Sequence, residues 1–325
     1  MMALPPRVQR ALAGRPVVRD GQTLAVDTQL MLRLQRVARK PAVEALPTIA
    51  EGRAALLDQA VLAGGTQPIG SVRDLAVAAR PARLYTPSGA PGRSGLLLFF
   101  HGGGFIYGDL ASHDAVCRFL AERAGVRVLA VDYRLAPEDP FPTAYDDAVA
   151  AHRWVIEHAD ELGADTTRLA VGGDSAGGNL AAGVAIEAAR SGLPLAFQLL
   201  MYPCTDAVRE TESAGLFGTG FFLTAEFMQL ATDSYLGPGD LRDPRISPAY
   251  LDLPAGLAPA YVATAGFDPL RDEGEAYARQ LEKAGCQVEL QRFSDQIHGF
   301  VNVLTARTSR AATATIAAKL AAAVG

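Results

Sequence analysis

The sequence predicts an α/β protein in which helices wrap a mixed, mostly parallel sheet. Short apolar, β-branched or aromatic runs alternate with longer helical patterns along most of the 325 residues. The central runs, 95–100 and 126–131, are almost continuously apolar, which is typical of strands covered by helices on both faces. Hydrophobic residues make up 49% of the chain and charged residues 20%, a composition that argues against disorder.

The elements follow one another in a regular order. Strands are expected at 72–77, 83–86, 95–100, 126–131, 168–172, 195–202, 260–265 and 288–293. Helices are expected at about 111–124, 143–162, 176–191, 225–236, 271–284 and 301–324. In the last of these, Ile316, Leu320 and Val324 recur every four residues and form one apolar stripe. The chain is therefore rich in strands at first and then continues as βαβα.

Two stretches depart from this alternation. Residues 1 to about 55 carry a helical apolar pattern before any strand begins, and residues from about 205 to 250 interrupt the strands with several phenylalanines. Long insertions of this kind often act as lids, and ordinary peripheral packing is the alternative. Because no repeat or low-complexity linker divides the chain, one domain is expected over residues 1–325.

The overall balance of residues excludes several classes of protein. A formal charge of −5, without blocks of like charge, gives no nucleic-acid footprint. Neither a signal-peptide core nor an apolar run long enough to span a bilayer is present in the sequence. Cys117, Cys204 and Cys286 are widely spaced, which indicates buried thiols and neither a disulfide frame nor a zinc site. A cytoplasmic protein is expected.

A Gly-x-Ser-x-Gly pattern, Gly173 to Gly177, follows an apolar run and precedes a helical one. Such a turn serves either to reverse the chain or to present the hydroxyl of Ser175 as a nucleophile. Both glycines are expected because a Cβ at either position would collide with the neighbouring strand or helix. The strand–turn–helix setting favours the nucleophile, and the following helix would place Ser175 near its positive end.

A serine hydroxyl reacts poorly unless a base lies beside it. Two later residues can supply a histidine base and a carboxylate that orients it. Asp268 follows the expected strand 260–265, and His298 lies past the strand 288–293. Each alone would pass for an ordinary loop residue, but the order Ser, Asp, His at strand carboxyl ends is that of a catalytic triad. The remaining histidines fit less well: His113, His152 and His158 are expected on solvated helix faces, and His101 belongs to another motif.

That motif is FFHGGGF, residues 99 to 105, directly after an apolar strand. Glycines let backbone N–H groups approach closely, as the oxyanion of an acyl-transfer intermediate requires. Gly103 and Gly104, together with the N–H of Ala176, are the expected oxyanion-hole donors. His101 is expected to brace the loop through hydrogen bonds.

These blocks together resemble the hormone-sensitive-lipase family of α/β-hydrolases, in its bacterial esterase branch. The matching segments are 101–105 (HGGGF), 132–138 (DYRLAPE), 173–180 (GDSAGGNL), 268–274 (DPLRDEG) and 297–300 (IHGF). The resemblance implies an eight-stranded, mostly parallel sheet with a helical cap, built from about 1–55 and about 205–250. It also implies the triad Ser175, Asp268 and His298 and a carboxylesterase acting on short- to medium-chain acyl esters.

The aromatic residues near these motifs suggest a pocket. Residues expected to line it are Phe105, Ile106, Tyr107, Phe217, Phe221 and Phe222. No cofactor or metal is expected, because water is the only other reactant in ester hydrolysis. An amide or formamide hydrolase, or a small-molecule-binding protein on the same fold, are the alternatives. The strand 288–293 is expected at a sheet edge, where it would favour a homodimer.

Overall fold

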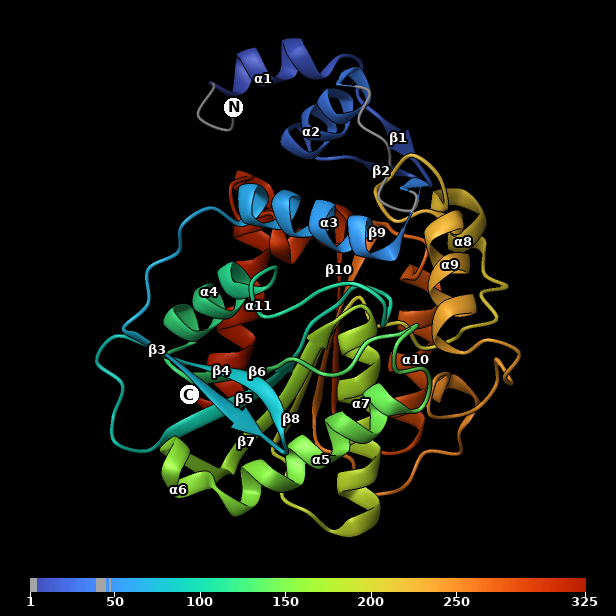
Figure 1. The fold of residues 1–325 in the computed structure, drawn as a ribbon. Helices are drawn as coiled ribbons and strands as arrows, with labels where there is room; N and C mark the ends of the chain where they lie inside the picture. The colour runs from blue at the N-terminus through green and yellow to red at the C-terminus, as the bar shows by residue number, and fades with distance from the viewer. Residues whose placement is uncertain (1–4, 39–44, 47) are drawn as a thin grey trace.

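The computed structural model describes residues 5–38, 45–46 and 48–325 and shows an eight-stranded sheet enclosed by helices (Figure 1). The strands lie in the order β10-β9-β8-β7-β5-β6-β4-β3. The pairs β3–β4 and β4–β6 are antiparallel, and all the other neighbouring pairs are parallel. The predicted α/β architecture with a mostly parallel sheet is therefore confirmed.

The bounds of the elements are as follows. The strands of the sheet are β3 (Ser71–Val77), β4 (Arg80–Thr86), β5 (Ser94–Phe100), β6 (Arg127–Val131), β7 (Ala164–Asp174), β8 (Phe197–Met201), β9 (Ala260–Phe267) and β10 (Val288–Ile297). The helices are α1 (Pro6–Ala13), α2 (Val26–Val37), α3 (Ile49–Gly64), α4 (Asp114–Ala124), α5 (Thr143–Glu157), α6 (Ala159–Leu162), α7 (Ala176–Ser191), α8 (Glu212–Phe217), α9 (Ala225–Tyr235), α10 (Arg271–Lys283) and α11 (Arg307–Val324). A short hairpin, β1 (Val18–Arg19) and β2 (Gln22–Thr23), precedes α2.

Strand β5 shows how the sheet is buried on both faces. Leu96, Leu98 and Phe100 pack into the core cluster that contains residues of α5, α7 and α10. Leu97 and Phe99 point the other way, into the cluster formed with α4 and α11. Since successive side chains of a strand alternate between faces, an uninterrupted apolar run serves both layers. Each such Leu or Phe contributes roughly 1.5–3 kcal/mol when fully buried.

The largest differences from the predicted bounds are in two helices. The predicted helix 143–162 is divided at His158, whose φ of −113° and ψ of 21° separate α5 from α6. The last helix begins at Arg307, because residues Phe300–Asn302 form a 3₁₀ turn instead of an α-helical one. Its apolar stripe is as predicted, with Ile316, Leu320 and Val324 all buried.

The N-terminal segment and the long insertion lie over one end of the sheet, beside the carboxyl ends of its parallel strands (Figure 1). The hairpin is held there by Arg271, whose guanidinium lies 2.6 Å from the Asp20 carboxylate. Helix α3 is anchored by Arg53, which lies 2.7 Å from the Glu138 carboxylate. These contacts fix α2 and α3 beside the strand ends that carry the candidate residues.

Candidate active site

Ser175 lies in the sharp turn between β7 and α7. Its φ of 57° and ψ of −117° are strained for a residue with a side chain. The turn is held by the Ser175 N–H, which donates a 2.9 Å hydrogen bond to the carbonyl of Met201. A Cβ at Gly173 or Gly177 would overlap the carbonyl oxygen of Phe100. Both glycines of the motif are therefore required by the close approach of β5.

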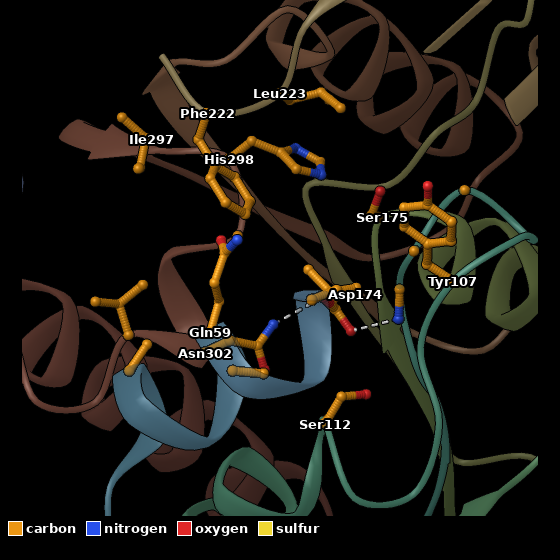
Figure 2. A pocket seen from close by; sticks show the side chains of 18 of the residues that line it. Gln59, Tyr107, Ser112, Asp174, Ser175, Phe222, Leu223, Ile297, His298 and Asn302 are labelled. Carbon is orange, nitrogen blue, oxygen red and sulfur yellow. Dashed lines mark hydrogen bonds between the residues drawn. The ribbon is translucent and has the colours of Figure 1, made fainter. Parts of the chain in front are cut away.

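His298 and Asp268 directly follow the neighbouring parallel strands β10 and β9. The His298 Nδ1 atom lies 2.8 Å from Oδ2 of Asp268, and both side chains are buried. The other carboxylate oxygen of Asp268 accepts a 2.8 Å hydrogen bond from the Leu270 N–H. With Nδ1 bound to the carboxylate, Nε2 is left for another partner, and Figure 2 shows the imidazole directed toward Ser175. The imidazole and the serine hydroxyl therefore face the same cavity.

The glycine loop after β5 lies beside Ser175. Gly103 has a φ of 122° and Gly104 a φ of 64°, conformations that favour glycine. Within the described part of the chain, the N–H groups of these two glycines donate no hydrogen bond. Both residues line the same cavity as Ser175 and His298. The loop therefore carries two N–H groups without a hydrogen-bond partner in the described chain, beside the cavity that Ser175 borders.

His101 braces this loop, as expected from the sequence. Its Nδ1 lies 2.8 Å from the Gly102 carbonyl, and its ring stacks on Tyr133 with centroids 4.3 Å apart. The Tyr133 hydroxyl donates a 2.7 Å hydrogen bond to the His101 carbonyl. Burial lowers the pKa of the His101 imidazole to about 4, so the ring is uncharged at neutral pH.

Asp174 is a buried residue that the sequence analysis did not single out. Its carboxylate accepts hydrogen bonds from the Gly102 N–H at 2.9 Å and the Asn302 amide at 3.2 Å (Figure 2). His113 Nε2 lies 3.3 Å from the same carboxylate. Burial acts to raise the pKa of Asp174, but His113 and the Gly102 N–H outweigh it, and the pKa lies below its ordinary value. Asp174 thus links the turn of Ser175 to the glycine loop.

The prediction of solvated helix faces is wrong for His113 and His152. His113 precedes α4 and faces inward to Asp174, with only 6% of its surface exposed. His152 is 2% exposed and lies 3.1 Å from the Pro194 carbonyl. Helical position alone does not tell which face the fold covers, and a buried hydrogen-bond partner makes an inward histidine stable.

A cavity of about 160 Å³ opens beside Ser175 and His298 (Figure 2). Of the residues expected in the pocket, Tyr107 and Phe222 line it. The N-terminal helices supply lining residues that the sequence did not identify: Met31 and Gln35 of α2, and Leu56, Gln59, Ala60 and Ala63 of α3. Figure 2 shows the Gln59 amide directed into the cavity. The sequence indicated a helical apolar pattern only within residues 1 to about 55, and such a pattern does not identify what a helix face lines.

A second, smaller cavity of about 30 Å³ also borders Ser175. Phe105 lines it, together with residues of one face of α9, namely Phe227, Met228, Ala231, Thr232 and Tyr235. Ser175 and Gly104 border both cavities. His298 borders the larger cavity and is not among the described residues around the smaller one.

Three residues expected in the pocket lie elsewhere. Ile106 is fully buried in the core, and its carbonyl accepts a 2.8 Å hydrogen bond from Arg53. Phe217 and Phe221 pack against Phe267, with ring centroids 5.6 and 5.3 Å apart. These two rings fix the insertion to the end of β9. Their apolar character was evident from the sequence, but the direction of the side chains depends on the tertiary fold.

The described residues contain no group of three or more His, Cys, Asp or Glu side chains arranged to hold a metal ion. No helix within them is long and apolar enough to cross a membrane. Cys117, Cys204 and Cys286 are all buried free thiols, as predicted.

Comparison with known proteins gives consistent similarities. A family model described as the alpha/beta hydrolase fold matches residues 97–302. The chain is 45% identical to the carboxylic ester hydrolase LipN of Mycobacterium tuberculosis over 314 residues, covering 92% of this chain and 83% of that protein. It is 42% identical over 254 residues to the ethyl acetate hydrolase of Pseudomonas putida, covering 75% of this chain and 80% of the other.

Solved structures are similar over nearly their full length. A hyperthermophilic esterase from Pyrobaculum calidifontis superposes with a TM-score of 0.87 at 36% identity, covering 92% of this chain and 98% of the other. An ester hydrolase from the metagenome of Lake Arreo, solved with a bipyridine phosphonate derivative, gives a TM-score of 0.87 at 39% identity, with coverage of 92% and 98%.

Proposed function

The chain belongs to the hormone-sensitive-lipase family of α/β-hydrolases and is a carboxylic-ester hydrolase, and from this premise we propose that it cleaves short acyl esters through an acyl-enzyme formed on Ser175. The observation that carries the proposal is the buried 2.8 Å contact between His298 and Asp268, with the imidazole directed toward Ser175. A strained turn that exposes a serine hydroxyl beside such a pair favours nucleophilic catalysis.

The two halves of the reaction use the same three residues. His298 Nε2 takes the hydroxyl proton as Ser175 Oγ bonds to the ester carbonyl carbon, and then returns that proton to the departing alkoxide. Water next attacks the acyl-enzyme, giving its proton to His298, and Ser175 Oγ leaves with that proton as the carboxylic acid is released. Asp268 holds the tautomer with the proton on Nδ1 and stabilises the charged imidazolium.

The negative oxygen of each tetrahedral intermediate is assigned to the N–H groups of Gly103, Gly104 and Ala176. The first two are unpaired within the described chain, and Ala176 is the first residue of α7. The helix dipole adds favourable potential at that end. Preorganised donors of this kind are worth roughly 10²–10³-fold each in rate.

The two cavities beside Ser175 receive different parts of the ester. The leaving oxygen must lie near His298 to accept a proton, and His298 borders the larger cavity. The alcohol portion is therefore assigned to the cavity of about 160 Å³ and the acyl chain to the cavity of about 30 Å³. The smaller space holds only a few atoms beyond the carbonyl carbon, which favours acyl groups at the short end of the predicted range.

The N-terminal segment and the insertion act as a cap in this proposal, with about 1–55 and about 205–250 as the predicted limits. Support comes from the cavity linings: Met31 and Gln35 of α2 border the larger cavity, and α9 borders the smaller one. The lining residues of α3 lie past residue 55, so this side of the cap extends to the end of that helix at Gly64. Residues 1–4, 39–44 and 47 of the predicted cap lie outside the described residues. A cap excludes water from the acyl-enzyme until the alcohol has left.

We further propose a homodimer formed through β10 in a cytoplasmic enzyme. Strand β10 is the outermost strand of the sheet and pairs only with β9 among the described strands. An edge strand with unpaired backbone groups favours pairing with a second copy. The three buried free thiols are compatible with a reducing compartment.

The test is a series of 4-nitrophenyl esters of increasing acyl length, with a 4-nitroanilide in parallel. We expect kcat/KM to be highest for acyl chains of about two to four carbons and the anilide to be cleaved far more slowly. Ser175→Ala should lower kcat by roughly 10⁴-fold or more while the melting temperature is retained. Near wild-type turnover by that variant would refute the proposed mechanism, and a preference for long acyl chains would refute the assignment of the cavities.

A further inference from the structure

Arg209 is an unexpected residue in the wall of the smaller cavity. Among the described residues that line this cavity, it carries the single charged side chain. The others are mainly apolar, including Leu223, Met228 and Ile246. Placing an arginine side chain among apolar groups costs free energy unless its N–H groups find hydrogen-bond acceptors. The Arg209 guanidinium is therefore expected to have hydrogen-bond acceptors, from the protein or from a ligand.

The protein provides few acceptors for this guanidinium. Its Nη1 donates a 2.9 Å hydrogen bond to the Thr232 hydroxyl and a long one of 3.5 Å to the Met228 carbonyl. The Nε atom is buried and has no hydrogen-bond partner in the described structure. The backbone of Arg209 has a φ of 57°, a strained conformation for an arginine. A guanidinium has five N–H donors, and no hydrogen bond of Nη2 occurs in the described structure, so its donors remain available to a ligand.

The buried carboxyl of Glu273 forms no ion pair with Arg209. Glu273 is 2% exposed, and its Oε1 accepts hydrogen bonds from the Thr205 and Asp206 N–H groups at 2.8 and 3.1 Å. No ion pair within 4.0 Å joins Arg209 to a carboxylate of the described chain. Burial raises the pKa of Glu273 to about 8, although Arg209 acts to lower it. Glu273 is therefore mostly protonated at neutral pH and adds little negative charge beside Arg209.

We infer that Arg209 binds a carboxylate at the end of the acyl chain, which makes monoesters of short dicarboxylic acids a substrate class of this enzyme. The inference rests on the proposed function, because it places the acyl chain in the smaller cavity. The ester carbonyl lies at Ser175 and the free carboxylate meets the open side of the guanidinium. Arginine is suited to this role, since its planar fork matches the two oxygens of a carboxylate. Arg209 is a specificity residue and takes no part in bond breaking.

The experiment compares charged esters with neutral esters of the same shape. Monoethyl malonate is paired with ethyl 3-methylbutanoate, and monoethyl succinate with ethyl 4-methylpentanoate, so that an isopropyl group replaces each carboxylate. Initial rates are followed by pH-stat with the wild type, Arg209→Gln and Arg242→Gln. The last variant is a matched control, because Arg242 is exposed and lies outside both cavities beside Ser175.

We expect Arg209→Gln to lower the ratio of kcat/KM for at least one charged ester to that of its neutral partner by roughly 10-fold or more, the size of a lost hydrogen bond between charged groups. The neutral esters should change less than about threefold, and Arg242→Gln should change neither. An unchanged ratio in Arg209→Gln for both pairs would overturn the inference.

A binding measurement separates this inference from the proposed mechanism. Ser175→Ala and the double variant Ser175→Ala/Arg209→Gln are titrated calorimetrically with monoethyl succinate and with ethyl 4-methylpentanoate. Tighter binding of the charged ester that disappears in the double variant would support Arg209 whether or not Ser175 is the nucleophile. Equal binding of the charged ester by both variants would refute it, while residual hydrolysis by Ser175→Ala would count against the mechanism alone.

Discussion

The carboxylate of Asp174 accepts a 2.9 Å hydrogen bond from the N–H of Gly102, which joins the residue before Ser175 to the start of the glycine loop. The same carboxylate is buried and contacts His113 and Asn302. This carboxylate therefore helps to set the position of Ser175, the proposed nucleophile, relative to the glycine loop that carries the proposed oxyanion donors. Displacements of about 1 Å in such a site can cost roughly 10²-fold in rate.

Replacing Asp174 should accordingly impair turnover more than binding. We expect Asp174→Ala to lower kcat by roughly 10²-fold with a smaller change in KM, and Asp174→Asn to recover part of the loss by accepting from Gly102. Steady-state kinetics at fixed pH measure both values. A change in KM alone, with kcat unaltered, would show that the contact between Asp174 and Gly102 does not position the glycine loop.

Asp268→Asn should leave the imidazole of His298 in the wrong tautomer, because an amide N–H facing Nδ1 removes the acceptor. We expect kcat to fall on the order of 10⁴-fold, by the serine-protease precedent. Labelling of Ser175 by an organophosphonate should slow in parallel. If the variant keeps more than a tenth of wild-type activity, Asp268 does not orient the base.

Gly104→Ala tests the oxyanion loop. A Cβ at this position would lie 2.9 Å from Cβ of Ala231, and the φ of 64° disfavours a side chain. We expect kcat to fall by roughly 10²–10³-fold, as on loss of an oxyanion donor. Gly125→Ala is the control, with a φ of 68° and no atom within 4 Å of the added Cβ. It should cost about 1–2 kcal/mol of stability and leave kcat unchanged.

Glu273→Gln tests the buried carboxyl beside Arg209. The unfolded chain ionises this group near its ordinary pKa of 4.5, whereas burial raises the folded pKa to about 8. Between these values the folded state binds the extra proton, so the free energy of unfolding falls as pH rises, by up to about 1.4 kcal/mol per pH unit. Glutamine removes this titration. Relative to wild type, the variant should therefore gain stability progressively from about pH 5 to pH 8.

Urea unfolding at pH 5, 7 and 9 measures the effect. Glu282→Gln, an exposed position on the same helix, should follow the wild-type pH dependence. Identical slopes for wild type and Glu273→Gln would show that Glu273 is ionised in the folded protein throughout this range.

The proposed dimer predicts concentration-dependent sedimentation. Leu290 on β10 is 37% exposed, and Leu290→Lys should weaken self-association by placing a charge on the edge strand. Leu241→Lys changes an equally exposed leucine in a loop and should not. A wild-type protein that sediments as a monomer at all concentrations would exclude the interface.

The parts of the fold that could be predicted from sequence are those set by local patterns. The apolar run of β5 and the glycines around Ser175 identify their own backbone conformations, and the strand order then brings Asp268 and His298 to the same edge. Phe217 and His113 could not be placed in this way. Their environment depends on Phe267 and Asp174, which are distant in sequence, and no periodicity indicates such contacts.

Ser175 borders two cavities with partly different linings: α2 and α3 line only the larger one, most of the α9 face lines the smaller one, and Phe227 of α9 lines both. With the alcohol and the acyl chain placed as proposed, substitutions in α2 and α3 would change the choice of alcohol and leave the acyl pocket as it is, whereas substitutions in α9 away from Phe227 would change the choice of acid. The specificity for the alcohol can then change in evolution with little change in the specificity for the acyl group. Related enzymes with this arrangement can accept new alcohols or new acids through changes in the cavity walls, without changes in the residues proposed to cleave the ester.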